Sequence, residues 1–517
     1  VQISSMVSLF QYPIHTFAFA LFFIFLLYVN NIDEVLPSAL VLPVLISVTA
    51  IGIVLVLPRI FKKKFDKVSV YLSLVVVLIF SYGHVFLFVE DIDVVGNEIR
   101  HRHLLIVFGV IFVISVLIIK FKTHPKTTIP ILNAIGLTVL ASTMIMLPYS
   151  ELFDQKSNIN TFVEETLVFE NQNKPDIYYI ILDEYAGRET LKKYFEYDNS
   201  DFISKLETNG FHVLENSKSN YVVTAFAAPS AMEMEYAHKS EKFSDVSSVN
   251  TIISDSYQQN KVMNFFNQND YKTVYIYGGI VEQIRISDEN LCSDKAMNDF
   301  HTMLTQTTMF WVVQKLQFIN NLNEIRFCAF DELELVGKNN SDPMFVFAHI
   351  KLPHDPFTIG ANGETITPKK IDLGIGSAGN KSGYLNQLEF TNKKIIELVP
   401  NIIANSEIPP IIIIQSDHGV RFDITLISSN QETLTDEDIM TLQRGYNNFS
   451  AFYFPDRDYD EIYDDMTPIN TFRIVFNKFF NADFQILDDE MYFQFRDDSE
   501  RFSNVTDIVL SPKQKLS

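Results

Sequence analysis

The chain has 517 residues, enough for more than one domain, and a formal net charge of −22. Nucleic-acid binding needs a basic face, so the acidic composition argues against that class of protein. The composition of the whole chain averages over two different parts: apolar runs dominate up to about residue 150, and an acidic, mixed sequence follows.

The first part contains five apolar segments, and most approach the ~20 residues that span a bilayer core. They are Tyr12–Val29, Leu36–Leu57, Val68–Val89, Leu104–Ile119 and Thr128–Leu147. The first segment lacks a basic start and is followed by four others, unlike a cleaved signal peptide. We therefore expect a transmembrane domain of five helices over residues 1–149.

The loops between these segments alternate in charge. Those at 59–67 and 120–126 are basic, whereas the first is acidic and the third is mixed with acidic residues leading. Basic loops stay in the cytoplasm, so five spans place the N-terminus inside and export everything after Pro148. This predicts a multi-pass protein of the bacterial inner membrane with a periplasmic or extracellular domain. His15 and His84 lie within spans without an acidic partner there, which favours helix packing over a proton path.

A polar stretch at 150–174 reads as a juxtamembrane linker with amphipathic patches. Beyond it lie both cysteines, Cys292 and Cys328. An oxidising compartment favours one bridge between them, and two unpaired buried thiols are the alternative.

From 175 to 517 strand-like and helix-like stretches alternate. The expected strands are Asp176–Leu182, Thr273–Tyr277, Met344–Ile350 and Ile411–Gln415, and the expected helices include Asp201–Thr208, Lys261–Asn269, Leu385–Val399 and Thr467–Phe480. Pro400 is expected to end or kink the third of these helices. Near-continuous apolar strands indicate an α/β domain, a mostly parallel sheet with helices on both faces.

Three of these strands end in residues suited to chemistry. Asp183 and Glu184 follow the first, a loop with His354 follows the third, and Asp417 and His418 follow the fourth. The carboxyl ends of parallel strands share one edge, so these residues can converge there. Carboxylates with imidazole suit one divalent metal such as Zn²⁺ or Mn²⁺ better than Ca²⁺. For Glu184 a solvent-facing turn is an equal alternative to a metal-binding role.

The best stretch for a nucleophile is Ser219–Met232, where Thr224 precedes a run of small residues. A hydroxyl at a helix N-terminus beside a metal is placed to lose its proton and attack phosphorus. From the local sequence alone, Thr224 is more simply a helix N-cap, and Ser230 is a competing hydroxyl. His349 lies inside its strand and is interpreted as a core histidine.

This order of motifs resembles the alkaline phosphatase/sulfatase superfamily: an acid after an early strand, a hydroxyl nucleophile, H-x-x-x-x-H and a late S-D-H-G. With five spans in front, the chain is similar to lipoteichoic acid synthases and lipid A phosphoethanolamine transferases. The resemblance implies an alkaline-phosphatase-like α/β/α sandwich. It also implies a metal held by Asp183, Thr224, Asp417 and His418, with Thr224 as nucleophile. His354, in L-P-H-D-P-F, matches the substrate-side histidine of that family.

The sequence departs from the family in two places. Sulfatases carry C/S-x-P-S-R where this chain has A-A-P-S-A, with Ala227 and Ala231 at the two altered positions, which speaks against sulfate-ester hydrolysis. The first acid, Asp183, is a glutamate in the transferases. Arg421 could clamp a phosphate, and a surface salt bridge is an equal alternative.

The resemblance implies a metal-dependent transferase in the membrane. It would move a phospholipid head group, of phosphoethanolamine or phosphoglycerol type, through a Thr phosphoester onto an envelope glycan or lipid. The alternative is a sulfatase-like or phosphodiesterase hydrolase using the same site, and a third reading is an inactive scaffold of the same fold. The loops between Ile280 and Asp342 are expected to decide which head group and acceptor are used.

Overall fold

The computed structural model describes the chain with gaps, and the chain forms two compact units. The described residues are 12–31, 37–60, 65–89, 93–94, 97–98, 101–146, 174–239, 260–279, 287–293, 299–338, 342–367, 380–422, 424, 427, 434–494 and 502–511. One unit, here the helical unit, comprises Val1–Thr161 and Met297–Phe318, and the other, the sheet unit, comprises Phe162–Ala296 and Ile319–Ser517. The expected linker at 150–174 lies outside the described residues except for Lys174.

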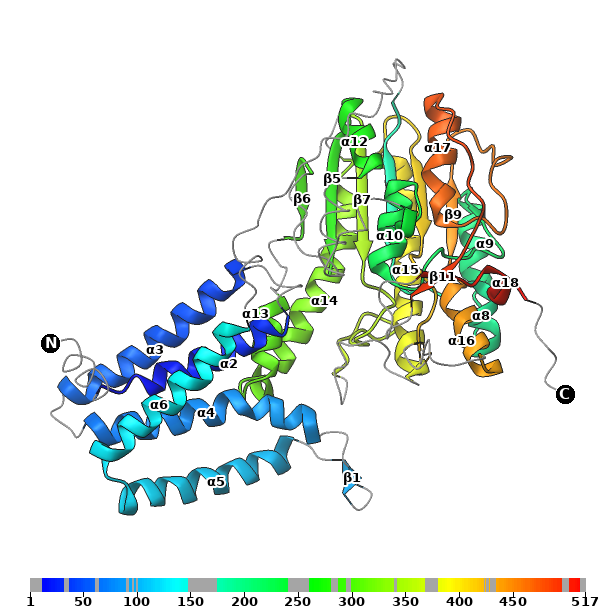
Figure 1. Ribbon diagram of the computed structural model, residues 1–517. Coiled ribbons are helices and arrows are strands. Elements are labelled where there is room, and N and C mark those ends of the chain that lie inside the picture. Colours follow the sequence, from blue (N-terminus) through cyan, green and yellow to red (C-terminus); the bar gives the residue numbers. More distant parts are fainter. Residues whose placement is uncertain are drawn as a thin grey trace. The chain divides into compact units, whose positions relative to one another are not determined.

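All five predicted apolar segments form helices in the helical unit (Figure 1). They are α2 (His15–Val29), α3 (Val41–Ile60, preceded by the 3₁₀ turn η1, Pro37–Leu40), α4 (Phe65–Val89), α5 (His101–Lys122) and α6 (Pro125–Ile145). A two-residue-strand hairpin, β1 (Asp93–Val94) and β2 (Asn97–Glu98), follows α4. By length and composition four of the helices can cross a membrane, and α2 is a shorter apolar helix of 15 residues.

The two intramembrane histidines take part in helix packing. His15 is fully buried, and its Nδ1 lies 2.5 Å from Oγ of Ser73 on α4. His84 stacks on Phe23 of α2 at a ring separation of 6.2 Å. Both contacts agree with the packing role expected from the sequence.

The sheet unit is built on a seven-stranded sheet in the order β4-β9-β8-β3-β7-β5-β6. The strands are β3 (Ile177–Leu182), β4 (His212–Val213), β5 (Lys272–Gly278), β6 (Glu289–Leu291), β7 (Met344–Ile350), β8 (Ile411–Gln415) and β9 (Ser450–Tyr453). Four of the six strand pairs are parallel, and only β9 pairs antiparallel, with β8 and β4. The predicted mostly parallel α/β sheet is confirmed.

Helices cover both faces of this sheet. Its helices are α8 (Arg188–Tyr194), α9 (Ser200–Thr208), α10 (Thr224–Glu233), α12 (Lys261–Gln268), the C-terminal part of α14 (Trp311–Leu335), α15 (Lys381–Asn405), α16 (Asp436–Tyr446), α17 (Thr471–Phe480) and α18 (Thr506–Leu510), with 3₁₀ turns η2 (Ala237–Lys239) and η6 (Pro468–Asn470). Strands β10 (Tyr492–Gln494) and β11 (Phe502–Asn504) pair antiparallel in a separate two-stranded sheet. Pro400 does not end its helix, because α15 continues through it to Asn405.

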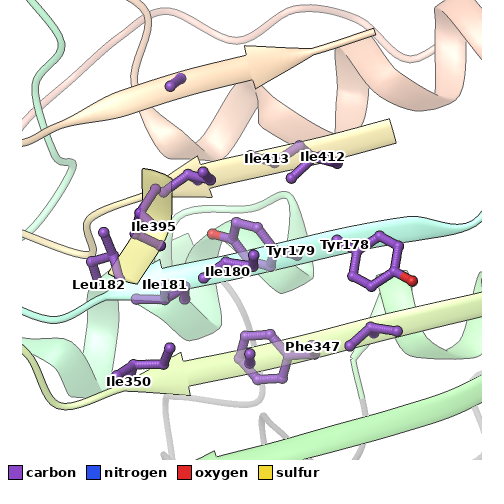
Figure 2. Close-up of a cluster of buried hydrophobic side chains, with 14 of the residues drawn as sticks. Tyr178, Tyr179, Ile180, Ile181, Leu182, Phe347, Ile350, Ile395, Ile412 and Ile413 are labelled. Carbon is purple, nitrogen blue, oxygen red and sulfur yellow. The ribbon is translucent and has the colours of Figure 1, made fainter. Parts of the chain in front are cut away.

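Strand β3 is buried on both faces and runs through the middle of the core (Figure 2). The ring of Tyr179 packs edge-on against Phe472 of α17, with centroids 5.0 Å apart, and stacks on Phe347 of β7. Its neighbour Tyr178 meets Ser406 at the end of α15. Successive residues of a strand point to opposite faces, so α17 and α15 lie on opposite sides.

A disulfide joins Cys292, directly after β6, to Cys328 on α14. The favoured alternative of the sequence is therefore correct. The bridge closes a loop with a sequence separation of 36 residues, which restricts the unfolded chain by about 4 kcal/mol in the chain-entropy description.

Removing both cysteines as Cys292→Ser/Cys328→Ser is expected to lower the stability of the sheet unit by up to about 4 kcal/mol, since the loop is then unrestricted. Thermal melting in detergent, followed by near-ultraviolet circular dichroism, would show a lower midpoint. A reductant should lower the wild-type midpoint and leave that of the double variant unchanged. Equal sensitivity of both proteins to the reductant would contradict this account.

Candidate metal centre and active site

The candidate site lies at the central strand β3, on either side of which the strand order proceeds in opposite directions. Strand β3 has β7 on one side and β8 on the other, and both run parallel to it. In open α/β sheets ligands bind beyond the carboxyl ends of the strands at such a switch point. The loops after these three strands carry the acids and histidines that the sequence singled out.

Asp183, Asp417 and His418 offer ligand atoms that all lie within 4.8 Å of one another, and all three side chains are buried. His418 Nε2 is 3.3 Å from Asp417 Oδ2 and 3.7 Å from Asp183 Oδ1. Two carboxylates and one imidazole at the end of a buried sheet form a donor set that suits a divalent transition metal.

Buried oxygen atoms that lack a hydrogen-bond partner indicate whether a cation would be stabilised at this position. Oδ1 of Asp183 and Oδ2 of Asp417 are buried and have no hydrogen-bond partner among the described residues. The other oxygen of Asp417 accepts from the backbone N–H groups of Glu184 and His418, at 3.2 and 2.9 Å. A buried carboxylate oxygen left without a partner costs free energy, and a cation between the two oxygens would remove that cost.

The ring of His418 is oriented and uncharged, as binding a cation requires. Its Nδ1 lies 2.8 Å from the carbonyl oxygen of Gly419, which fixes the tautomer and leaves the Nε2 lone pair toward the two carboxylates. Burial lowers the pKa of His418 to about 3, so the ring is neutral, as a metal ligand must be. Burial and the neighbouring Asp417 raise the pKa of Asp183 to about 7.

Thr224 is the first residue of α10, and its Oγ1 lies 3.2 Å from His418 Nε2. The N-cap of this helix is Val223, so the alternative that Thr224 is simply an N-cap is wrong. The hydroxyl sits at the positive end of the helix dipole, next to the acid and histidine group. Ser230, the competing hydroxyl, is fully buried six residues further along α10 and is not presented to a substrate.

Near Asp183 lie Glu184, His354 and Arg421. Glu184 is buried in a left-handed conformation with φ of 62°, and its Oε1 accepts the backbone N–H of Arg421 at 2.7 Å. Nη2 of Arg421 is 3.0 Å from Nε2 of His354, which lies 3.7 Å from Oε2 of Glu184. Glu184 is therefore not a solvent-facing turn residue, and Arg421, 8% exposed, is not in a surface salt bridge.

His349 is the penultimate residue of β7. It is fully buried within β7, and burial lowers its pKa to about 4. Among the described residues the metal-competent group consists of Asp183, Asp417 and His418 without it. This agrees with the core role that the sequence favoured.

Two residues that position the loop 351–357, here called the histidine loop, were not identified from the sequence. Asp355 Oδ1 lies 2.9 Å from Nδ1 of His354, on the side of the ring away from Arg421. Arg326 of α14 is fully buried, and its guanidinium donates to the carbonyl oxygens of His354 and Pro356. It donates also to Thr358 Oγ1 and Gln387 Oε1. In sequence Arg326 looks like a surface residue of an amphipathic helix, whereas Asp355 adjoins His354 in L-P-H-D-P-F and could have been suspected.

Replacing Arg326 with methionine is expected to destabilise the sheet unit by at least about 3 kcal/mol, because buried acceptors of the histidine loop lose their donor. The matched control is Lys338→Met. Lys338 pairs with Glu334 on the exposed surface just after α14, and such pairs contribute at most about 1 kcal/mol. Thermal melting of the two variants would measure the difference, and equal midpoints would refute a structural role for Arg326.

Comparison with known proteins finds similarity in structure only. No family model matches the chain, and no curated protein matches its sequence. The Escherichia coli EcEptC periplasmic domain in complex with Zn is 13% identical, with a TM-score of 0.40 over 62% of this chain and 91% of that one. The integral membrane lipooligosaccharide phosphoethanolamine transferase A of Neisseria meningitidis is 10% identical, with a TM-score of 0.39 over 86% of this chain and 76% of that one.

A third structure is a protein in the alkaline phosphatase superfamily from Vibrio parahaemolyticus. It is 12% identical, with a TM-score of 0.38 over 66% of this chain and 79% of that chain. Solved structures of the alkaline phosphatase superfamily and of phosphoethanolamine transferases are thus what this chain is similar to.

Proposed function

We propose that this protein is a membrane-anchored, metal-dependent transferase that moves the head group of a phospholipid through a covalent ester on Thr224. The observation that carries the proposal is the placement of the Thr224 hydroxyl 3.2 Å from His418 Nε2. It lies beside two buried carboxylates with unsatisfied oxygens. A hydroxyl at that position has the surroundings of an activated nucleophile.

The metal would be held by Asp183, Asp417 and His418 with Thr224 beside it, and Zn²⁺ or Mn²⁺ suits this donor set. When bound it supplies positive charge that favours the alkoxide form of Thr224. Asp417 is held by two backbone N–H groups and His418 by the Gly419 carbonyl, so both side chains are oriented in advance.

In the first step Oγ1 of Thr224 attacks the phosphorus of the phospholipid head group. The bond from phosphorus to the diacylglycerol oxygen breaks, and diacylglycerol leaves after that oxygen takes a proton. In the second step a hydroxyl of an envelope glycan or lipid attacks the Thr224 phosphoester, which restores the threonine. Both steps exchange one phosphoester for another, so no other co-reactant is needed.

Arg421 and His354 are the groups suited to hold the phosphate. Nε of Arg421 is buried and has no hydrogen-bond partner among the residues that the structure describes. A guanidinium with a donor to spare recognises phosphate oxygens well. His354 Nε2 accepts from Arg421 Nη2 at 3.0 Å, and it would exchange a proton with a leaving oxygen once a bound phosphate takes over that guanidinium donor.

Attachment to the membrane suits this chemistry. The donor lipid is confined to the bilayer surface, and anchoring the site there raises the effective concentration of the donor. The basic loops at 59–67 and 120–126 favour a cytoplasmic N-terminus and a periplasmic or extracellular sheet unit. The proposed location is therefore the bacterial inner membrane, facing outward.

Mass spectrometry of the peptide that contains Thr224, after incubation of the purified protein with membrane lipids, tests the proposal. A mass increase on Thr224 equal to a phosphorylated head group is expected, and its size identifies the group. The released products separate transfer from hydrolysis, since a free head group indicates water as acceptor and a modified glycan or lipid indicates transfer. An unmodified Thr224 together with a protein that binds no divalent metal would favour the inactive scaffold.

A further inference from the structure

A stretch of the chain between two strands of the sheet leaves the sheet unit. Residues 299–318, here the excursion, follow β6 and precede β7, yet they group with the helical unit. The excursion contains α13 (Asp299–Gln306) and the first two turns of α14. The Cys292–Cys328 bridge closes the chain on both sides of it.

The excursion is attached to the first helices of the helical unit. Phe300 is buried in a cluster with Ile24 and Tyr28 of α2 and with Ala39 of η1. Its ring meets that of Tyr28 edge-on at 6.2 Å. His301 Nε2 lies 3.0 Å from the carbonyl oxygen of Ala39.

A second attachment is made through the backbone of α4. The N–H of Gly83 donates to the Thr307 carbonyl at 3.0 Å, and the N–H of Met309 donates to the Ile79 carbonyl at 2.9 Å. Gly83 and Ile79 are one helical turn apart, so the excursion lies against the helix backbone itself. A Cβ on Gly83 would stand 2.2 Å from the Gln306 carbonyl oxygen, which explains why this position is glycine.

These contacts lie toward one end of the bundle, and the one furthest from that end is at Ile79, ten residues before the last residue of α4. Ile24 and Tyr28 belong to the last turns of α2, and Ala39 comes just before α3 begins. Met309 also packs against a cluster that includes Leu104, in the first turn of α5. The basic loops connect α3 to α4 and α5 to α6, at the opposite ends of these helices. The excursion is therefore bound at the end that the charge pattern places outside.

The excursion leaves a row of large apolar side chains uncovered. Phe310, Val313 and Leu316 are 52%, 76% and 54% exposed and recur every three residues, while Gln314 and Gln317 are exposed beside them. Isolated exposed apolar residues are common, but three at a spacing of three residues lie on one side of the helix and form an apolar row, which Gln317 shares. Such a row needs a covering partner.

The neighbouring surface indicates what that partner is. Met309 and Val312, which directly precede Phe310 and Val313, pack against a cluster that includes Leu104 of α5. The next two residues of α5, Leu105 and Ile106, are themselves exposed and belong to a helix apolar enough to cross a membrane. The uncovered row thus borders the surface that faces lipid acyl chains, and an aromatic residue beside apolar ones is typical of the membrane interface.

We propose that Phe310, Val313 and Leu316 are seated in the outer leaflet of the bilayer, at the boundary between head groups and acyl chains. The excursion is then a second membrane attachment of the sheet unit, besides the covalent connection through residues 147–173. A segment of this kind lies in the plane of the interface, with its apolar side chains buried ~5–10 Å into the boundary between head groups and acyl chains. The inference rests on the membrane-spanning helices and not on the proposed transfer reaction.

The chain offers a direct probe, because Trp311 is its single tryptophan. In a Trp311→Phe background, Val313→Trp moves the only indole to the most exposed position of the row. The full-length protein would be reconstituted in phosphatidylcholine vesicles with or without acyl chains brominated near the head group. Matched proteins carrying Ile106→Trp on α5 and Ile486→Trp in the sheet unit provide the lipid-facing and water-facing references.

We expect brominated lipid to quench the indole at 313 by roughly half or more, because a side chain at the acyl boundary lies close to the bromines. We also expect aqueous iodide to quench it less than the indole at 486. Strong quenching by iodide without quenching by bromine would show that the row faces water and would overturn the proposal. Protection from both quenchers would show that protein covers the row, which overturns it equally. The three positions that receive tryptophan are exposed, and the buried Trp311 is replaced by another aromatic residue in every variant, so the variants should fold. No outcome depends on enzymatic activity.

Discussion

Replacing Thr224 with alanine is expected to lower the rate of head-group transfer by about 10³-fold or more while the protein stays folded. That loss corresponds to at least about 4 kcal/mol of transition-state stabilisation, and loss of a covalent nucleophile commonly costs more. The physical reason is the geometry, because Oγ1 of Thr224 is held 3.2 Å from His418 Nε2 beside the two orphaned carboxylate oxygens. Release of diacylglycerol from labelled phospholipid in proteoliposomes measures the rate.

Two controls make this result specific. Thr224→Ser keeps a hydroxyl at the same place and should retain measurable activity, although it loses the methyl group that restricts the rotamer. Ser230→Ala alters the buried hydroxyl on the same helix and should leave the rate within a few-fold of wild type. Full activity of Thr224→Ala together with loss of activity in Ser230→Ala would transfer the nucleophile to Ser230.

The contribution of Asp183 to the stability of the metal-free protein, measured as the difference between wild type and Asp183→Asn, is expected to be lost as the pH rises from about 4 to about 7, and divalent metal should offset this loss. Burial and Asp417 raise the pKa of Asp183 from 3.8 to about 7 in the folded chain. A raised carboxyl pKa means that the folded state binds the proton more tightly than the unfolded state. Its contribution is therefore present below the unfolded pKa and is lost as the pH rises through the folded pKa.

The variant Asp183→Asn separates the two effects. Without metal it should melt at a higher temperature than wild type at pH 8, since one buried charge and its repulsion from Asp417 are gone. With zinc in excess the order should reverse. Wild type should gain about 4 kcal/mol at a zinc concentration ~1,000 times the dissociation constant, and the variant should gain far less.

Melting midpoints at several pH values, with a chelator and with zinc, measure this prediction, and elemental analysis gives the metal content. The control is Asp270→Asn, since Asp270 is an exposed acid of the same unit that pairs only loosely with Lys174. A zinc-dependent rise in midpoint that is as large in Asp183→Asn as in wild type would remove Asp183 from the metal site.

Much of the candidate site follows from a property that a sequence displays directly. Strands that are buried on both faces have continuous apolar sequences, and the residue at which such a run stops marks the end of the strand. Asp183 and Asp417 were located in this way, and the parallel pairing of β3 with β8 brings them together. The five apolar helices were equally visible, because a bilayer demands length and apolarity at once.

The remaining features depend on contacts that no local pattern records. Arg326 is buried because backbone carbonyls of a loop some 30 residues later need donors, and its own helix gives no sign of this. The attachment of the excursion rests on a glycine of α4 and on Phe300, each of which is ordinary in its local sequence. Pro400 was expected to end or kink its helix, and it does not end it, because α15 continues to Asn405.

The central position of β3 has a consequence for how the protein is made. Its two neighbours, β7 and β8, are both encoded much later, and β8 ends only at Gln415. While the chain is being synthesised, the strand Ile177–Leu182 therefore has both edges unpaired, and such strands favour wrong pairing. Capacity to bind metal should then appear only in chains completed past His418, and earlier fragments would depend on chaperones.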